Sequence, residues 1–150
     1  MRYSKLLLAV LVFAGTSIAA DPFVETWKLN SAKTKYKTGM APKEQTVTFS
    51  EEGSDLHVMV KGTTSEDKPI STHFTVPTGG GTGKIIEAPY DAVSAQVKGN
   101  ERDTRFSKSG KVVYTAKAKR SADGKTMTVT VKGTNAVGQM VAGTAFYDKQ

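Results

Sequence analysis

Apolar and polar side chains alternate strictly in short segments along most of this 150-residue chain, which constrains its fold more than any other feature. A period of two puts successive side chains on opposite faces of a β-strand, one face buried and the other solvated. Clusters of turn-forming residues separate the segments at short intervals. The pattern predicts an all-β protein of eight or nine short strands, with candidates at residues 24–29, 45–49, 56–61, 70–76, 92–98, 104–108, 111–119, 126–132 and 140–147.

Strands that follow one another through short turns form an antiparallel meander, and a meander of this length removes its exposed edges by curling into a barrel. We therefore expect a single domain over residues 21–150, folded as a closed or nearly closed antiparallel barrel. A two-sheet β-sandwich is the alternative, because it fits the same strand count and turn spacing. Only residues 30–37 have a weak helical pattern, which Gly39 and Pro42 end.

Turn residues predict the register of three hairpins. Asp123-Gly124 is a strong signal for a two-residue turn. A four-residue turn is expected after Ser50, and a further hairpin is centred near Ser65. The predicted cross-strand pairs are Ala118 with Val129, Ala116 with Val131, Phe49 with Leu56, Val47 with Val58, Leu56 with Phe74 and Val60 with Ile70.

The N-terminal residues have the build of a secretory signal peptide. Arg2 and Lys5 precede an apolar run over residues 6–14, and small residues lead to Ala20 before Asp21. The apolar run is shorter than the roughly 20 residues that cross a bilayer. We therefore expect residues 1–20 to be removed and the mature protein to be exported, to the periplasm or the medium, with no transmembrane segment.

The charge distribution and the cysteine content bear on two questions, namely which partners the protein binds and whether it has disulfides or a lipid anchor. The chain carries 21 Lys and Arg residues against 14 Asp and Glu residues, spread along its length without the aromatic interleaving of a nucleic-acid-binding surface. Cysteine is absent, so the fold has neither disulfides nor a thiol that could carry a lipid. Nucleic acid is not an expected partner, and the oligomeric state is not predicted.

The two ends of the mature chain resemble a known superfamily. A Thr26-Trp27-Lys28-Leu29 opening strand, a long meander and a last strand ending Phe146-Tyr147-Asp148-Lys149 are similar to the calycins. This superfamily includes lipocalins and intracellular fatty-acid-binding proteins. The chain looks most like small exported lipocalin-like proteins of bacteria, whose functions are mostly unassigned. The resemblance implies a ligand-binding barrel in which Trp27 is a structural residue that plugs one end.

The chain departs from the calycin pattern at three places. Glu25 stands where calycins have a glycine before the Trp dipeptide. Residues 30–41 are too short, and too interrupted by Gly and Pro, for the helical pair of the fatty-acid-binding proteins. Their Arg-x-Tyr carboxylate anchor has no match, because Thr144 precedes Phe146 on the last strand. The resemblance therefore does not imply fatty-acid binding specifically.

Residues that could carry chemistry are few. The segment over residues 78–84 is glycine-rich but lacks the spacing of a phosphate-binding loop, and a flexible surface loop is expected there. His57 and His73 are predicted to lie opposite each other beside Thr48, but a metal site needs more ligands than two. No catalytic motif is present. We therefore expect no enzyme activity, no metal and no cofactor.

Two functions remain open. The first is binding of a small hydrophobic ligand inside the barrel, because small inward side chains would leave space. The expected cavity residues are Tyr114, Ala116, Ala118, Val129, Val131 and Ala142. The second is a surface-interaction module with a filled core that binds an anionic polymer or a protein through its loops or its basic face. That face comprises Lys117, Lys119, Thr128, Thr130 and Lys132.

Overall fold

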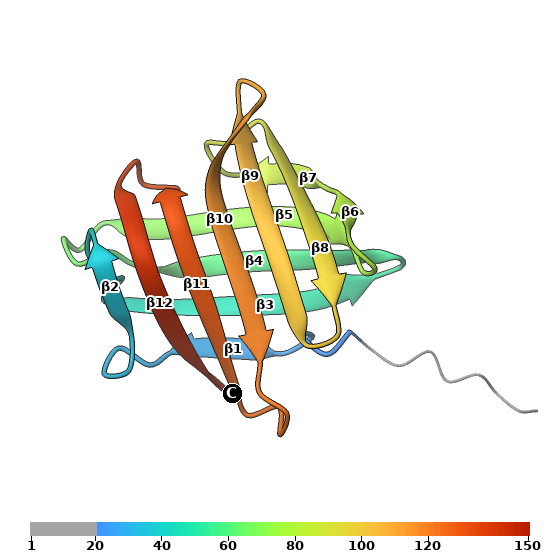
Figure 1. Cartoon of the computed structure of the whole chain (residues 1–150), viewed down its shortest axis with the longest axis horizontal. Coiled ribbons are helices and arrows are strands. Elements are labelled where there is room, and N and C mark those ends of the chain that lie inside the picture. The colour runs from blue at the N-terminus through green and yellow to red at the C-terminus, as the bar shows by residue number, and fades with distance from the viewer. Residues whose placement is uncertain (1–20) are drawn as a thin grey trace, which may run out of the picture.

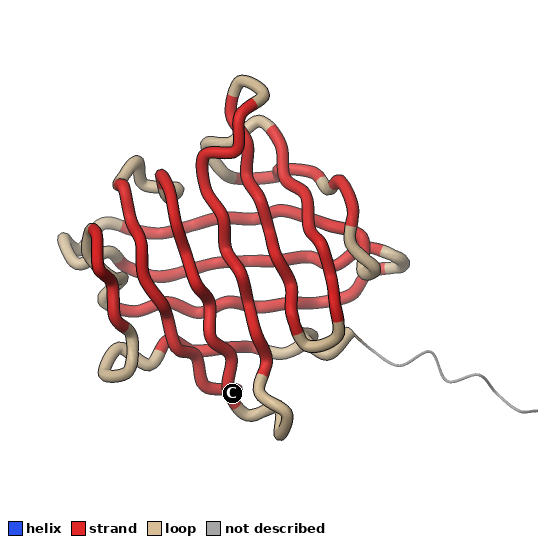
Figure 2. Tube along the Cα trace, in the orientation of Figure 1, coloured by secondary structure: helices blue, strands red, loops and turns tan. Residues whose placement is uncertain are grey.

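The computed structural model describes residues 21–150, which form an all-β barrel (Figures 1 and 2). The predicted signal peptide over residues 1–20 lies outside the described residues. Within residues 21–150 no helix is long and apolar enough to span a membrane. The strands are β1 (Thr26–Leu29), β2 (Lys35–Thr38), β3 (Glu44–Glu52), β4 (Asp55–Thr63), β5 (Pro69–Pro77), β6 (Gly81–Thr82), β7 (Lys84–Glu87), β8 (Ala92–Lys98), β9 (Glu101–Lys108), β10 (Lys111–Arg120), β11 (Thr126–Thr134) and β12 (Met140–Lys149).

One continuous antiparallel sheet bends back on itself to make the barrel. Its strands follow the order β6-β8-β9-β10-β11-β12-β1-β3-β4-β5-β7. The short strand β2 lies off this path and pairs with residues 142–144 of β12. Figure 1 shows β8–β12 crossing in front of β3–β5, with β1 along the lower edge of both groups. The short strand β1 therefore joins two halves of the sheet whose inner faces enclose the core, which confirms the predicted antiparallel barrel.

The two edges of the sheet meet at the glycine-rich segment. β6 pairs with β8, β7 pairs with β5, and only Gly83 separates β6 from β7. The amide of Gly83 donates to the carbonyl oxygen of Val93 at 2.9 Å, and a Cβ at this position would collide with the backbone of Thr75. Residues 78–84 thus form the seam of the barrel, through strands and turns rather than the surface loop expected from the sequence.

The register predicted for the Asp123-Gly124 hairpin is confirmed, since Ala118 lies opposite Val129 and Ala116 opposite Val131. The other two predicted registers are wrong by two residues. A tight turn at Gly53, whose φ is 62°, keeps Glu52 in the ladder, and Phe49 therefore pairs with Val58. β4 and β5 are likewise offset, so that Leu56 pairs with Val76, Val58 with Phe74 and Val60 with Thr72. A shift of two residues leaves each side chain on its predicted face.

No helix forms over residues 30–37, in contrast to the weak expectation from the sequence. Asn30 begins a turn, and residues 35–38 form β2 alongside β12. The approach is close because Gly143 lies opposite Tyr36, where a Cβ on the glycine would come within 2.5 Å of the Tyr36 Cα. This contact brings the Tyr36 side chain to the barrel wall.

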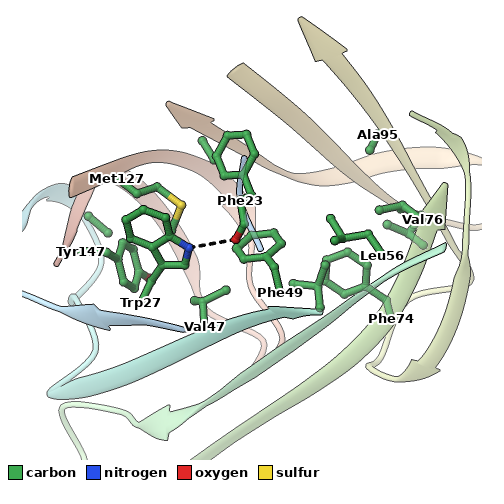
Figure 3. Close-up of a cluster of buried hydrophobic side chains, with 14 of the residues drawn as sticks. Phe23, Trp27, Val47, Phe49, Leu56, Phe74, Val76, Ala95, Met127 and Tyr147 are labelled. Atoms are coloured by element: carbon green, nitrogen blue, oxygen red, sulfur yellow. Dashed lines mark hydrogen bonds between the residues drawn. The ribbon is translucent and has the colours of Figure 1, made fainter. Parts of the chain in front are cut away.

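Trp27 belongs to the buried core of the barrel (Figure 3), and its role as a plug at one end stays a prediction from the calycin resemblance. Its side chain is fully buried, with Phe23, Met127 and Tyr147 around it. The indole N–H donates to the carbonyl oxygen of Phe23 at 3.1 Å. The rest of the core continues from Trp27 through Phe49, Leu56 and Phe74 into the two halves of the sheet.

Candidate ligand cavity

The barrel interior is not completely filled. A cavity of about 150 Å³ lies between the two halves of the sheet, with apolar side chains of β3–β5 on one side and of β9–β12 on the other. Empty apolar cavities of about this volume hold a molecule the size of benzene. The turn residues Asn135–Val137 and Pro42 line it at one end, and Arg102 lines it near the start of β9. The surface-interaction module considered above assumes a filled core, and the barrel core is not filled.

Five of the six residues expected at the cavity line it, namely Tyr114, Ala116, Ala118, Val129 and Val131. Ala142 does not, and its expected inward position is wrong. Its neighbours Val141 and Ala145 face the buried interior, and Ala142 has the opposite parity on β12. Ala116 and Ala118 are the small side chains of the β10 wall, so truncated side chains on this strand help to leave the space open.

Aromatic rings make up much of the wall, including several that sequence reasoning missed. Phe106 meets Phe74 edge to face with ring centroids 5.0 Å apart, and its centroid lies 4.8 Å from that of Tyr90. The Tyr90 and Tyr114 rings stack at 6.3 Å with an interplanar angle of 7°. The alternating pattern of β9 indicates that Phe106 faces inward. Tyr90 lies in the loop between β7 and β8, where no such pattern indicates its direction.

All four tyrosines of residues 21–150 line the cavity. Burial raises the pKa of Tyr36 to about 12 and raises the pKa of Tyr90, Tyr114 and Tyr147 above the ordinary value. Each hydroxyl is therefore neutral at physiological pH. Tyr90 donates to the carbonyl oxygen of Thr134 at 2.9 Å, and Tyr147 donates to Gln45 Oε1 at 2.5 Å.

Arg102 is a buried charge at the edge of the cavity that the sequence did not reveal. Its Nη2 donates to Asp21 Oδ2 at 2.6 Å, and the two side chains are 2% and 4% exposed. The guanidinium carbon lies 5.6 Å from the centroid of the Phe23 ring. Burial lowers the pKa of Arg102, and the Asp21 carboxylate opposes this shift. The first residue after the predicted leader thus neutralises an arginine on β9.

His57 and His73 are in contact but not directly opposite, because of the two-residue offset. His57 lies opposite Thr75 and His73 opposite Met59, and their Nδ1 and Nε2 atoms are 3.2 Å apart. The other ring nitrogen of His57 is 3.1 Å from Glu52 Oε2. Within the described residues, no group of three or more His, Cys, Asp or Glu side chains is arranged to hold a metal ion.

The basic face predicted on β10 and β11 lies on the outside of the barrel. Lys117 pairs with Thr130 and Lys119 with Thr128, as expected. A shallow outer groove at this face is lined by Asp103, Arg105, Val112, Thr115, Lys117, Thr130 and Lys132. An acidic residue and a valine in the groove interrupt the positive charge, so the face is mixed rather than uniformly basic.

The side chains that line the cavity are mostly apolar and aromatic. The described residues that line it include no His, Cys, Lys, Asp or Glu, the side chains that most often transfer protons or act as nucleophiles. The lining consists of apolar side chains, aromatic faces, neutral hydroxyl and amide groups and the guanidinium of Arg102. Such walls hold a small molecule by burial and orient it by a few hydrogen bonds.

Comparisons with known proteins identify no family for this chain. No protein-family model matches it, and no curated protein matches it. Among solved structures, the crystal structure of zebrafish ileal bile acid-binding protein complexed with cholic acid is similar, with a TM-score of 0.49 and 12% sequence identity. The match covers 86% of this chain and 99% of that one. Membership of the calycin superfamily therefore stays a prediction.

Proposed function

We propose that this protein is an exported, non-catalytic carrier that binds a small hydrophobic molecule inside its barrel. The observation that carries the proposal is the apolar cavity of about 150 Å³ between the two halves of the sheet. Burying apolar ligand surface there gains about 25 cal/mol per Å². The lining supplies shape and area for binding, and its polar groups are suited to orientation rather than reaction.

The proposal of export rests on Arg2, Lys5 and the apolar run over residues 6–14, which have the pattern of a signal peptide. An exported carrier would meet its ligand in the periplasm or in the medium. The resemblance of the chain ends to lipocalin-like proteins agrees with a carrier. The mixed outer groove near Lys117 and Asp103 gives less support to a partner recognised by charge.

The proposal is tested with toluene, a neutral aromatic molecule of suitable size. Heteronuclear NMR of the protein should show saturable, one-to-one shifts that centre on the methyl groups of Ala116, Val129 and Val131. Absence of saturable binding, or shifts confined to the outer groove at Thr115 and Thr130, would overturn the proposal. If toluene binds in the cavity, mass spectrometry of small molecules that co-purify with the exported protein would identify the natural ligand.

A further inference from the structure

On the basis of the binding function proposed above, we propose that the cavity selects uncharged ligands over carboxylates of the same shape. The preferred ligand carries a hydroxyl, carbonyl or amide group on a small hydrophobic body. The apolar cavity disfavours a carboxylate, and Asp21 preserves this preference because it already neutralises Arg102, the charged residue among the described residues that line the cavity. Asp21 is thereby a specificity-determining residue, although it lies outside the wall itself.

The charge inventory of the cavity is short. Among the described residues that line it, Arg102 is the only charged one. Its Nη2 is held by Asp21 Oδ2 at 2.6 Å, and the carbonyl oxygen of Thr78 lies 3.4 Å from the same nitrogen. The Nε and Nη1 atoms are buried without a hydrogen-bond partner, on a guanidinium that lies near the Phe23 ring. The charge of Arg102 is therefore matched by Asp21 through Nη2 before any ligand arrives, whereas Nε and Nη1 make no hydrogen bond within the described residues.

A carboxylate that entered this cavity would lose its hydration without gaining an unmatched positive charge. Burial of an ionised group without a counter-ion is unfavourable, and the buried carboxylate of Asp21 would repel a second anion near Arg102. An uncharged group of the same shape avoids both costs. Since like-charge juxtaposition costs several kcal/mol, a preference of at least about tenfold is expected.

The cavity also offers neutral partners for a neutral polar group. The hydroxyls of Tyr90 and Tyr147 donate within the protein, whereas no hydrogen bond of the Tyr36 or Tyr114 hydroxyl is found within the described chain. Tyr114 pairs with Phe106, which is four residues along β9 from Arg102. At about 3.3 Å per residue, the backbone positions of Phe106 and Arg102 are roughly 13 Å apart along β9. The Tyr36 and Tyr114 side chains, both in the cavity lining, thus supply hydroxyls to which a neutral polar group can bond.

The test compares benzamide with benzoate, which have the same shape and differ in charge. Dissociation constants are measured by ligand-observed NMR at neutral pH, with toluene as the reference for the cavity itself. Benzamide should bind at least about tenfold more tightly than benzoate. Equal or tighter binding of benzoate, with toluene bound, would overturn the selectivity alone. Failure of toluene to bind would instead contradict the proposed function.

Two variants examine the role of the ion pair. Asp21→Asn leaves the Arg102 charge unmatched, and benzoate binding should then improve by about tenfold relative to benzamide. An unchanged ratio in this folded variant would contradict the proposal. The double variant Asp21→Leu/Arg102→Met removes both charges, a replacement that buried pairs commonly tolerate. In this double variant, the preference for benzamide over benzoate should stay within about threefold of that of the parent. A rise of about tenfold in that preference would show that Arg102 binds the carboxylate in the parent and would overturn the proposal.

Discussion

The indole N–H of Trp27 donates to the carbonyl oxygen of Phe23 at 3.1 Å, which ties the first strand to the segment before it. Both side chains are fully buried, and the Phe23 ring lies 5.7 Å from that of Phe49, on β3. The bond thus holds the N-terminal segment as a cover over one end of the core. Because Asp21 in this segment also pairs with Arg102, the same cover fixes the charge balance at the cavity.

Trp27→Ala should lower the free energy of unfolding by about 3 to 5 kcal/mol, because it removes a large aromatic side chain from the core. Trp27→Phe keeps most of the packing and loses the hydrogen bond, so a smaller loss is expected. Equilibrium denaturation in urea measures both changes. A loss below about 1 kcal/mol for the alanine variant would contradict the role of Trp27 as a plug.

Exported protein should begin at Asp21 or Ala20, because small residues precede both bonds. Cleavage before Asp21 would create an α-amino group at the nitrogen that lies 2.7 Å from Glu51 Oε1. N-terminal sequencing of protein from the periplasm and the medium checks this prediction. Recovery of intact Met1 on that material would show that residues 1–20 are not a cleaved signal peptide.

The buried tyrosines should make the barrel sensitive to base. The pKa of Tyr36 is raised from 10.0 to about 12, and burial raises the other three as well. Above pH 10 the unfolded chain loses tyrosine protons that the folded chain keeps, so the free energy of unfolding falls as pH rises. The contribution of the protonated tyrosines to the free energy of unfolding is fully present below about pH 10. It is lost as the pH rises from about 10 through the raised pKa values of the folded protein. Urea denaturation at pH 9 to about 12 measures the slope, and Tyr36→Phe should make it shallower.

The sequence predicts the barrel well where local signals act together. Around Ala116 and Val131, strict alternation and the Asp123-Gly124 turn agree, and the predicted register is correct. At Phe49 the turn length was ambiguous, because Glu51 and Glu52 suit a turn as well as an exposed strand end. The predicted register therefore differs from the observed one by two residues, although the buried face is the same.

The features that shape the cavity depend on contacts between distant parts of the chain. Asp21 and Arg102 are 81 residues apart, and neither has a local pattern that indicates an ion pair. Tyr36 reaches the wall because β2 docks at Gly143, and its short polar strand resembles a loop in sequence. Such long-range pairing requires the closed barrel, so periodicity reveals the small residues of the wall but not its polar groups.

His57 and His73 should bind zinc more weakly than micromolar, because two ligands on an outer face leave the tetrahedral site incomplete. Their ring nitrogens are 3.2 Å apart, and Glu52 lies 3.1 Å from His57 Nε2. Calorimetric titration with zinc measures the affinity, with His73→Ala as the comparison. Micromolar or tighter binding that disappears in His73→Ala would establish a metal site after all.

Ala116→Phe should abolish toluene binding while leaving the barrel folded, because the new ring occupies the cavity that Ala116 lines. Where space exists, the added side chain fills it at limited cost, but in a packed core such a change strains the structure by about 1 to 3 kcal/mol. Ala92→Phe is the matched control, since Ala92 is an exposed strand residue, and it should leave binding unchanged. Toluene titration and urea denaturation of both variants separate the alternatives. Loss of binding with retained stability supports the carrier, whereas a destabilised variant and a parent that binds no toluene would favour an interaction module.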